Sequence, residues 1–206
     1  NKMEKIDDAG VFETFISNLH NYSVYKFHFR NARGEYVDKA DPFAFLSEYR
    51  PGTCSRLFNY EGFQWHDAPF LKTRTRNFDQ PMSIYEMHLG SWKGKVDNRN
   101  LSYEEIADYL IPYVKELGYT HVEFMPVMEH PYEPSWGYQV TGFFAANSRF
   151  GSPQDLMFLI DELHQQDIGV ILDWVPSHFP GDANGLHYFD GSFLYEHEDP
   201  RKGFHP

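Results

Sequence analysis

The amino-acid sequence predicts an α/β fold in which a short antiparallel β segment precedes parallel strands that alternate with helices. From about residue 82 onward, extended apolar runs and segments of helical periodicity follow in the order strand, helix, strand, helix, strand. That order requires parallel strands joined by right-handed crossovers. The chain has 206 residues, 41% of them hydrophobic, so it can build a substantial core.

The first part of the chain has the pattern of an antiparallel β module. Residues 24–30 alternate polar with apolar side chains, residues 31–34 supply turn chemistry, and residues 35–38 resume an extended pattern. This sequence predicts a hairpin. Residues 41–52 are expected to form a loop, and residues 60–65 a further strand.

These patterns divide the chain near residue 75. A complete β sandwich needs about seven strands, so residues 1–75 are expected to be only the tail of a β domain plus a linker. Residues 76–206 are expected to be the first part of a parallel α/β domain. Because parallel strands are seldom left exposed, we expect the sheet to continue beyond Pro206.

The second part begins with a predicted strand at residues 83–89. Ser102 and Glu105 have the spacing of a capping box, which marks the start of a helix. Gly118 can take the left-handed conformation that ends this helix, and Pro112 predicts a kink within it. Helical spacing predicts a buried stripe formed by Ile106, Leu110, Val114 and Leu117.

A second strand is predicted at residues 120–127 and a third at residues 169–175. Residues 128–151, which follow the second strand, are too many for a simple connector and are expected to be a functional loop. Ser152 caps the next helix. Its predicted buried stripe consists of Leu156, Leu159, Ile160 and Leu163. Residues 181–206 lack periodicity and are expected to form a long loop.

The third strand carries a carboxylate, Asp173, and a histidine, His178, just past its end. Side chains alternate along a strand, so Asp173 shares a side with Ile171 and Val175 and is expected to be buried. A buried carboxylate requires a cationic or donor partner. The loop that holds His178 is expected at the carboxyl edge of the sheet, where substrates bind. Taken alone, this pair is explained equally well by two interpretations. Asp173 and His178 could be functional residues, or they could be a structural carboxylate and an ordinary loop histidine.

Composition excludes several classes of partner. The formal net charge of −12 disfavours nucleic acid and anionic membranes, whereas a neutral ligand is compatible with it. No apolar run is long enough to span a bilayer. Cys54 is the single cysteine, which excludes an internal disulfide and favours a cytoplasmic location. No cofactor motif is present, and the spacing of the carboxyl-terminal histidines matches no metal site.

Aromatic residues make up 18% of the chain. Most are expected to pack in the core and in hairpins, but some could be platforms for sugar rings. The best candidates are Trp136 and Tyr138, which lie within residues 135–139 together with Gln139. As an isolated feature, this cluster is explained better by loop packing.

Several motifs in the same order resemble the glucan-branching members of the α-amylase family of glycoside hydrolases. Residues 173–180, which read Asp-Trp-Val-Pro-Ser-His-Phe-Pro, resemble the branching form of the first signature region of that family. Residues 135–144, 150–153 and 194–203 are similarly characteristic. Debranching relatives usually carry a Val-Val-Tyr-Asn-His type of sequence in place of residues 174–178.

The resemblance implies a glycan-binding-type β sandwich followed by a (β/α)8 TIM barrel, of which this chain would hold the first three strands. It implies that Tyr138 stacks on the glucose at the cleavage subsite, that His178 bonds the hydroxymethyl group of that sugar, and that Asp173 holds an arginine of the following strand. Trp136 and Gln139 would also contact substrate. Ser177 stands where many amylases have a calcium-ligating asparagine, so no metal is expected.

The resemblance further implies an enzyme that cleaves α-1,4-glucan and transfers the cut chain to form α-1,6 branches in glycogen. Retaining transfer needs a nucleophilic carboxylate and an acid about 5 Å apart. The family pattern puts this Asp and Glu beyond Pro206, so the chain is expected to be a catalytically inactive fragment. The alternative is a non-catalytic glucan-binding protein on a truncated amylase scaffold. Oligomeric state stays open.

Overall fold

The computed structural model describes residues 1–74, 79–93 and 99–203. Its centre is a parallel sheet of β8 (Ile84–Met87), β9 (His121–Phe124) and β12 (Gly169–Leu172), in the spatial order β12, β9, β8. Val122 in the middle strand is in register with Tyr85 on one side and Val170 on the other. The predicted parallel strands are therefore confirmed, each a little shorter than expected.

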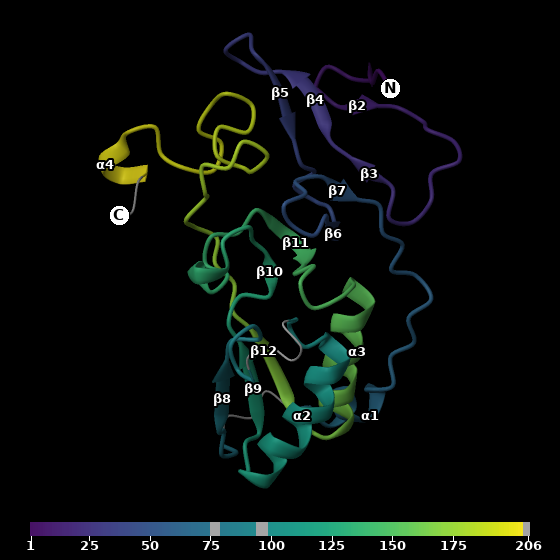
Figure 1. Ribbon diagram of the computed structural model, residues 1–206, viewed down its shortest axis with the longest axis vertical. Coiled ribbons are helices and arrows are strands. Elements are labelled where there is room, and N and C mark those ends of the chain that lie inside the picture. The colour runs from purple at the N-terminus through teal and green to yellow at the C-terminus, as the bar shows by residue number, and fades with distance from the viewer. Residues whose placement is uncertain (75–78, 94–98, 204–206) are drawn as a thin grey trace.

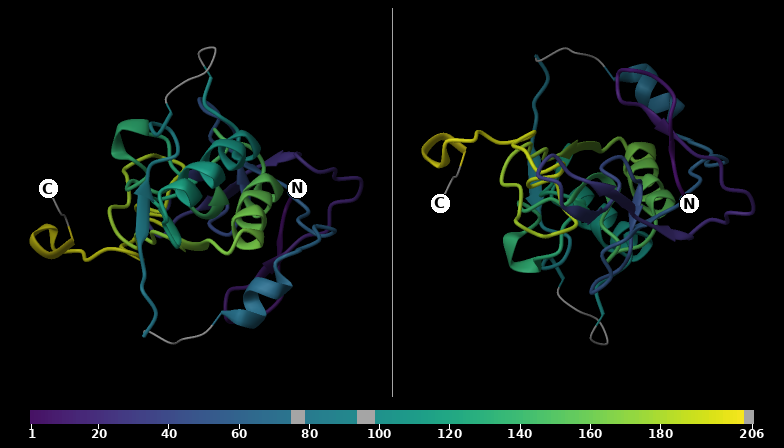
Figure 2. Two further views of the ribbon diagram at one scale, coloured as in Figure 1. Left: turned by 90° about the horizontal axis from the view of Figure 1, so that it is seen from below. Right: turned by 90° about the horizontal axis from the view of Figure 1, so that it is seen from above.

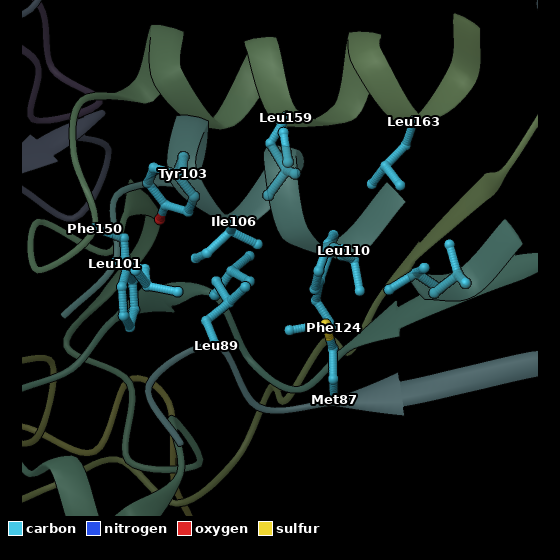
Figure 3. Packing of buried hydrophobic residues seen from close by; sticks show 14 of the residues in the cluster. Met87, Leu89, Leu101, Tyr103, Ile106, Leu110, Phe124, Phe150, Leu159 and Leu163 are labelled. Carbon is cyan, nitrogen blue, oxygen red and sulfur yellow. The ribbon is translucent and has the colours of Figure 1, made fainter. Parts of the chain in front are cut away.

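Helices α2 (Tyr103–Glu116) and α3 (Pro153–Gln165) pack against each other and against one face of this sheet (Figures 1 and 3). Fifteen buried residues fill the space between helices and strands, and they include Met87, Ile106, Leu110, Phe124, Leu159 and Leu163. Burying one such side chain contributes roughly 1.5–3 kcal/mol. This core fixes where the carboxyl ends of the strands lie.

Both helices begin with a capping box. In α2 the Ser102 hydroxyl accepts from the Glu105 N–H, and the Glu105 carboxylate accepts from the Ser102 N–H at 2.8 Å. Arg99 also donates to Glu105, and this hydrogen bond lowers the pKa of that carboxyl to about 2. In α3, Ser152 and Asp155 form the same reciprocal pair.

The predicted end of α2 is confirmed, because Gly118 has a left-handed backbone with φ of 75°. The helix continues through Pro112 as one element. The predicted stripe is right for Ile106, Leu110 and Val114 but wrong for Leu117, which is 54% exposed. Leu117 is the carboxyl-terminal cap of the helix, so its side chain is not on the buried face.

The amino-terminal part forms short antiparallel pairs. Strands β1 (Glu4–Lys5) and β2 (Phe12–Glu13) pair with each other, and β4 (Phe27–Arg30) pairs with β5 (Tyr36–Lys39). The second pair is the predicted hairpin. The expected strand at residues 24–30 is interrupted, because β3 (Val24–Tyr25) belongs to a different sheet.

That sheet joins both parts of the chain. Its order is β10, β11, β6, β7, β3, and β6 (Leu46–Ser47) runs parallel to β11 (Gly142–Ala146). Strand β7 (Ser55–Arg56) pairs antiparallel with both β6 and β3. The amino-terminal module is therefore bonded directly to the segment that follows β9.

Three sequence-based expectations are wrong in detail. The expected strand at residues 60–65 is irregular, because Glu61 and Gly62 form a turn with Gly62 at φ of 89°. The expected loop at residues 41–52 contains β6. The long loop after β9 contains β10 (Met128–Glu129), the 3-10 helix η1 (Glu133–Ser135) and β11.

The linker between the two parts carries α1 (Ala68–Thr73), and two histidine–aspartate pairs bind it to α3. His66 Nδ1 lies 2.9 Å from Asp161 Oδ2, and His164 Nδ1 lies 2.7 Å from Asp67 Oδ2. Because each segment supplies one histidine and one aspartate, the pairs cross-link the linker to the outer side of the helix.

Residues 181–199 have irregular structure, as expected, but a short helix, α4 (Pro200–Gly203), follows. Both views in Figure 2 show α4 projecting from the rest of the molecule. Within the described ranges, no helix is long and apolar enough to cross a membrane.

Candidate functional site

Asp173 lies directly after β12, where its backbone N–H donates to the Phe124 carbonyl at 3.0 Å. Its side chain is only half-buried, so the expected full burial is wrong. The strand is also less buried than its apolar sequence suggested, since Leu172 is 47% and Trp174 is 52% exposed. β12 is an edge strand of the described sheet, and this leaves one of its sides open.

Asp173 is expected to have a cationic or donor partner. In the structure this partner is Tyr138. The tyrosine hydroxyl donates to Asp173 Oδ2 at 2.7 Å. This hydrogen bond to the carboxylate, with some burial, raises the pKa of Tyr138 to about 12. The pair joins two of the predicted site residues at the carboxyl end of the parallel sheet. Three of the five candidate site residues, Trp136, Tyr138 and Gln139, lie on the segment after β9.

A tight turn places Tyr138. The Tyr138 N–H donates to the Ser135 carbonyl at 3.0 Å, across Trp136 and Gly137, which both have left-handed backbones. A side chain at Gly137 would collide with the Pro126 carbonyl group. Only glycine fits there, so the geometry of the turn and the position of the Tyr138 ring depend on Gly137.

His178 and Gln139 line one hollow of about 500 Å³. The same hollow is lined by Ser177, Asp182 and Glu196. His178 itself is exposed and has a left-handed backbone with φ of 53°. The structure thus brings together His178 and Gln139 in the hollow, while Tyr138 and Asp173 pair beside it.

Trp136 is placed differently. It is 57% exposed and is not among the described residues that line this hollow. Its neighbour Tyr138 in the same turn does bond to Asp173. The Trp136 ring is therefore exposed at the surface. It does not line the hollow with His178 and Gln139.

Sequence reasoning missed Asp182 and Glu196. The sequence pattern of residues 181–206 predicts only a long loop, yet Glu196 is half-buried and its Oε2 lies 2.7 Å from His187 Nδ1. No spacing rule links these residues, because an irregular loop brings them together. In the part of the chain that the structure describes, no group of three or more His, Cys, Asp or Glu residues could hold a metal.

Comparison with known proteins agrees with this geometry. Residues 105–205 match the family model described as alpha amylase, catalytic domain. A putative alpha amylase from Salmonella typhimurium superposes with a TM-score of 0.75 and 24% identity, over 97% of this chain and 31% of that one. A pullulanase from Bacillus acidopullulyticus gives a TM-score of 0.72 and 20% identity, over 99% of this chain and 28% of that one. Over the matched range the chain is similar to the α-amylase family, and its fold is of the (β/α)8 barrel type.

Curated relatives identify the branch of this family. The sequence is 54% identical to the 1,4-alpha-glucan branching enzyme of Aquifex aeolicus over 99% of this chain and 33% of the relative. It is 53% identical to the enzyme of the same name from Desulfitobacterium hafniense, over 95% of this chain and 31% of the relative. The chain spans about a third of the length of these relatives. The resemblance inferred from the sequence motifs is confirmed.

Proposed function

We propose that this chain is part of a 1,4-α-glucan branching enzyme, which cleaves an α-1,4-glucan and transfers the cut chain to a 6-hydroxyl of another glucan. The observation that carries the proposal is the 54% identity to a named branching enzyme across 99% of the chain. The tyrosine–carboxylate pair at the carboxyl end of a parallel sheet supports it, because barrel enzymes place their substrates there.

The proposal gives each site residue a role. Tyr138 stacks on the glucose at the cleavage subsite, His178 bonds the hydroxymethyl of that sugar, and Asp173 orients an arginine of the next strand. Gln139 contacts the glucan from the wall that it shares with His178. Trp136 offers an exposed ring at the periphery, where a longer glucan can stack.

The domain boundary belongs to the same proposal. Residues 1–75 are the tail of a glycan-binding-type sandwich with its linker, and residues 76–206 are the first part of the barrel. The antiparallel β4–β5 hairpin before α1 and the parallel sheet of β8, β9 and β12 after it support this division. The pairing of β6 with β11 means that the two domains share hydrogen bonds.

The transfer itself requires two carboxyl groups that we place in the remainder of the natural polypeptide. The nucleophile forms a bond to C1 as the C1–O4 bond breaks, and the acid gives its proton to O4. The acceptor 6-hydroxyl then attacks C1, releases the carboxylate and returns its proton to the second group. Residues of this chain hold the sugar in place during both steps.

Product analysis on amylose tests the proposal with the natural protein that carries this chain. New α-1,6 linkages without a matching increase in reducing ends show branching, whereas reducing ends alone show hydrolysis. Glucan binding with neither product would instead favour a non-catalytic glucan-binding protein. Asp173→Ala should abolish branching and retain glucan binding, while Asp108→Ala, at an exposed position of α2, should change neither.

A further inference from the structure

Hydrogen bonds join the β4–β5 hairpin to the irregular segment after β12 at several points, and Figure 1 shows the course of both segments. The Ala32 N–H donates to the Asp190 carbonyl at 2.6 Å, and the Ala40 N–H donates to the Asn184 carbonyl at 3.1 Å. Lys39 is 4% exposed, and its Nζ donates to the carbonyls of Gly185 at 3.0 Å and His187 at 3.1 Å. These bonds fix the hairpin against residues 184–191.

Arg33, in the turn of this hairpin, is held over the same segment. Its Nε donates to the Gly191 carbonyl at 3.0 Å, and its guanidinium carbon lies 4.6 Å from the centre of the Tyr188 ring. These two contacts orient the planar group and leave its two terminal nitrogens without a hydrogen bond in the described part of the chain. A preorganised guanidinium of this kind binds a ligand with little further loss of freedom.

Arg33 borders a second hollow, of about 630 Å³. Its other walls include Ser192, Phe193, Glu196 and Glu198. Glu196 lines both this hollow and the one beside His178. Because His187 Nδ1 holds Glu196 Oε2 at 2.7 Å, this shared wall has a defined position. The two hollows therefore meet at one ordered carboxylate.

The lining of the second hollow suits a neutral sugar better than an anion. Its lining combines guanidinium donors with carboxylate acceptors, and Phe193 supplies an apolar ring. Sugar hydroxyl groups both donate and accept, and the faces of sugar rings pack on aromatic groups. A phosphate or carboxylate ligand would meet the negative charge of Glu196 and Glu198.

We propose that this second hollow is an outer subsite for the same α-1,4-glucan that occupies the hollow beside His178, with Arg33 donating to the hydroxyls of a distant glucose unit. This inference rests on the proposed function and adds to it. It makes the amino-terminal hairpin part of the glucan-binding surface. It also assigns Arg33 a role in determining how many glucose units of the glucan the enzyme binds.

The dissociation constants of linear maltooligosaccharides of increasing length test this subsite in the natural protein. For the unchanged protein, affinity should increase with chain length until the sugar reaches Arg33. In Arg33→Ala this increase should stop earlier, so that long chains bind about fivefold to tenfold more weakly while short chains bind as before, as expected for one or two lost hydrogen bonds. A defect in folding would weaken short and long chains alike.

Arg30→Ala is the matched control, because Arg30 is an exposed hairpin arginine whose Nε donates to Gly34 within the turn. It should leave all affinities unchanged. If Arg33→Ala lowers the melting temperature, Glu198→Gln, which changes another lining residue of the same hollow, replaces it in the test, with the same expected loss for long chains only. Two results in the deciding variant overturn the proposal. One is an affinity that depends on chain length as it does in the unchanged protein, and the other is an equal loss of affinity for short and long chains.

The amylose assay separates this outcome from a failure of the proposed function. If the unchanged protein forms no α-1,6 linkages, the branching assignment is wrong whatever the affinities are. If it branches normally and Arg33→Ala retains the full length dependence, only the outer subsite is refuted.

Discussion

The Tyr138 hydroxyl donates to Asp173 Oδ2 at 2.7 Å and connects the turn after η1 to the end of β12. The two residues lie 35 positions apart in the sequence. The carboxylate thus has a donor partner within the described chain, and this partner also orients the ring of Tyr138. One hydrogen bond therefore holds two candidate substrate-binding groups in a defined relation before any glucan is bound.

This bond predicts the effect of Asp173→Asn on the ionisation of Tyr138. The carboxylate stabilises the protonated phenol, and it is the largest cause of the Tyr138 pKa being raised to about 12. Loss of the negative acceptor should lower this pKa toward the ordinary value of about 10. Carbon NMR of labelled tyrosine measures it, and Tyr138→Phe identifies the resonance. A Tyr138 pKa that stays at about 12 in Asp173→Asn would show that the hydrogen bond is not the cause.

Lys39→Met should destabilise the contact between the hairpin and residues 184–191. The buried ammonium donates to two carbonyls, and burial lowers its pKa. Methionine fills similar space but leaves both carbonyls without their donor, which costs about 1–3 kcal/mol. Urea unfolding measures this loss, and faster proteolysis within residues 184–191 should accompany it. Lys115→Met, where an exposed Nζ donates to Gln166, should change little, and equal stability of the two variants would contradict the prediction.

Asp161→Asn should loosen the linker from α3. Asp161 is 2% exposed and accepts from the His66 N–H at 2.8 Å, from the His66 ring at 2.9 Å and from Gln165 at 3.1 Å. An amide has one acceptor oxygen, so at least one of these donors loses its hydrogen bond to the buried residue, at a cost of about 0.5–1.5 kcal/mol. Thermal unfolding measures it against Asp108→Asn on the exposed side of α2. Similar melting temperatures for both variants would show that the cross-link is not stabilising.

The parts of the fold that were predicted well are those specified by local chemistry. The capping boxes at Ser102 and Ser152 and the helix end at Gly118 depend on residues within one turn of each other. The alternation of strands and helices is also visible in local patterns, and the preference for right-handed crossovers then gives the parallel order. These features can be read from the sequence because the groups that stabilise them are adjacent in it.

The errors occur where distant segments pair. Nothing in residues 41–52 indicates that Leu46 aligns with Ala146 of β11. At the site, the edge position of Asp173 and His178 could be predicted, but the partner Tyr138 and the hollow with Glu196 could not. Such contacts depend on how an irregular segment folds back, and side-chain periodicity carries no information about that.

A buried polar group on the segment after β9 gives a prediction for acid stability. His130 is 3% exposed, and its Nδ1 lies 2.9 Å from the Met128 carbonyl oxygen and 3.1 Å from Asn147 Nδ2. Because a carbonyl oxygen can only accept, Nδ1 carries the proton and donates to Met128. Burial lowers the pKa of the His130 imidazole to about 4.

The sign of the pH effect follows from this pKa. Between about pH 6.5 and 4 the unfolded chain binds a proton at His130 that the folded chain does not, so the free energy of unfolding should decrease as the pH falls through this range. The contribution is on the order of 3 kcal/mol. Chemical unfolding of His130→Gln at several pH values should show a smaller decrease than the unchanged protein, because glutamine cannot take up that proton. If both proteins lose the same stability between pH 6.5 and 4, His130 is not the group that responds, and the acid sensitivity arises elsewhere in the fold.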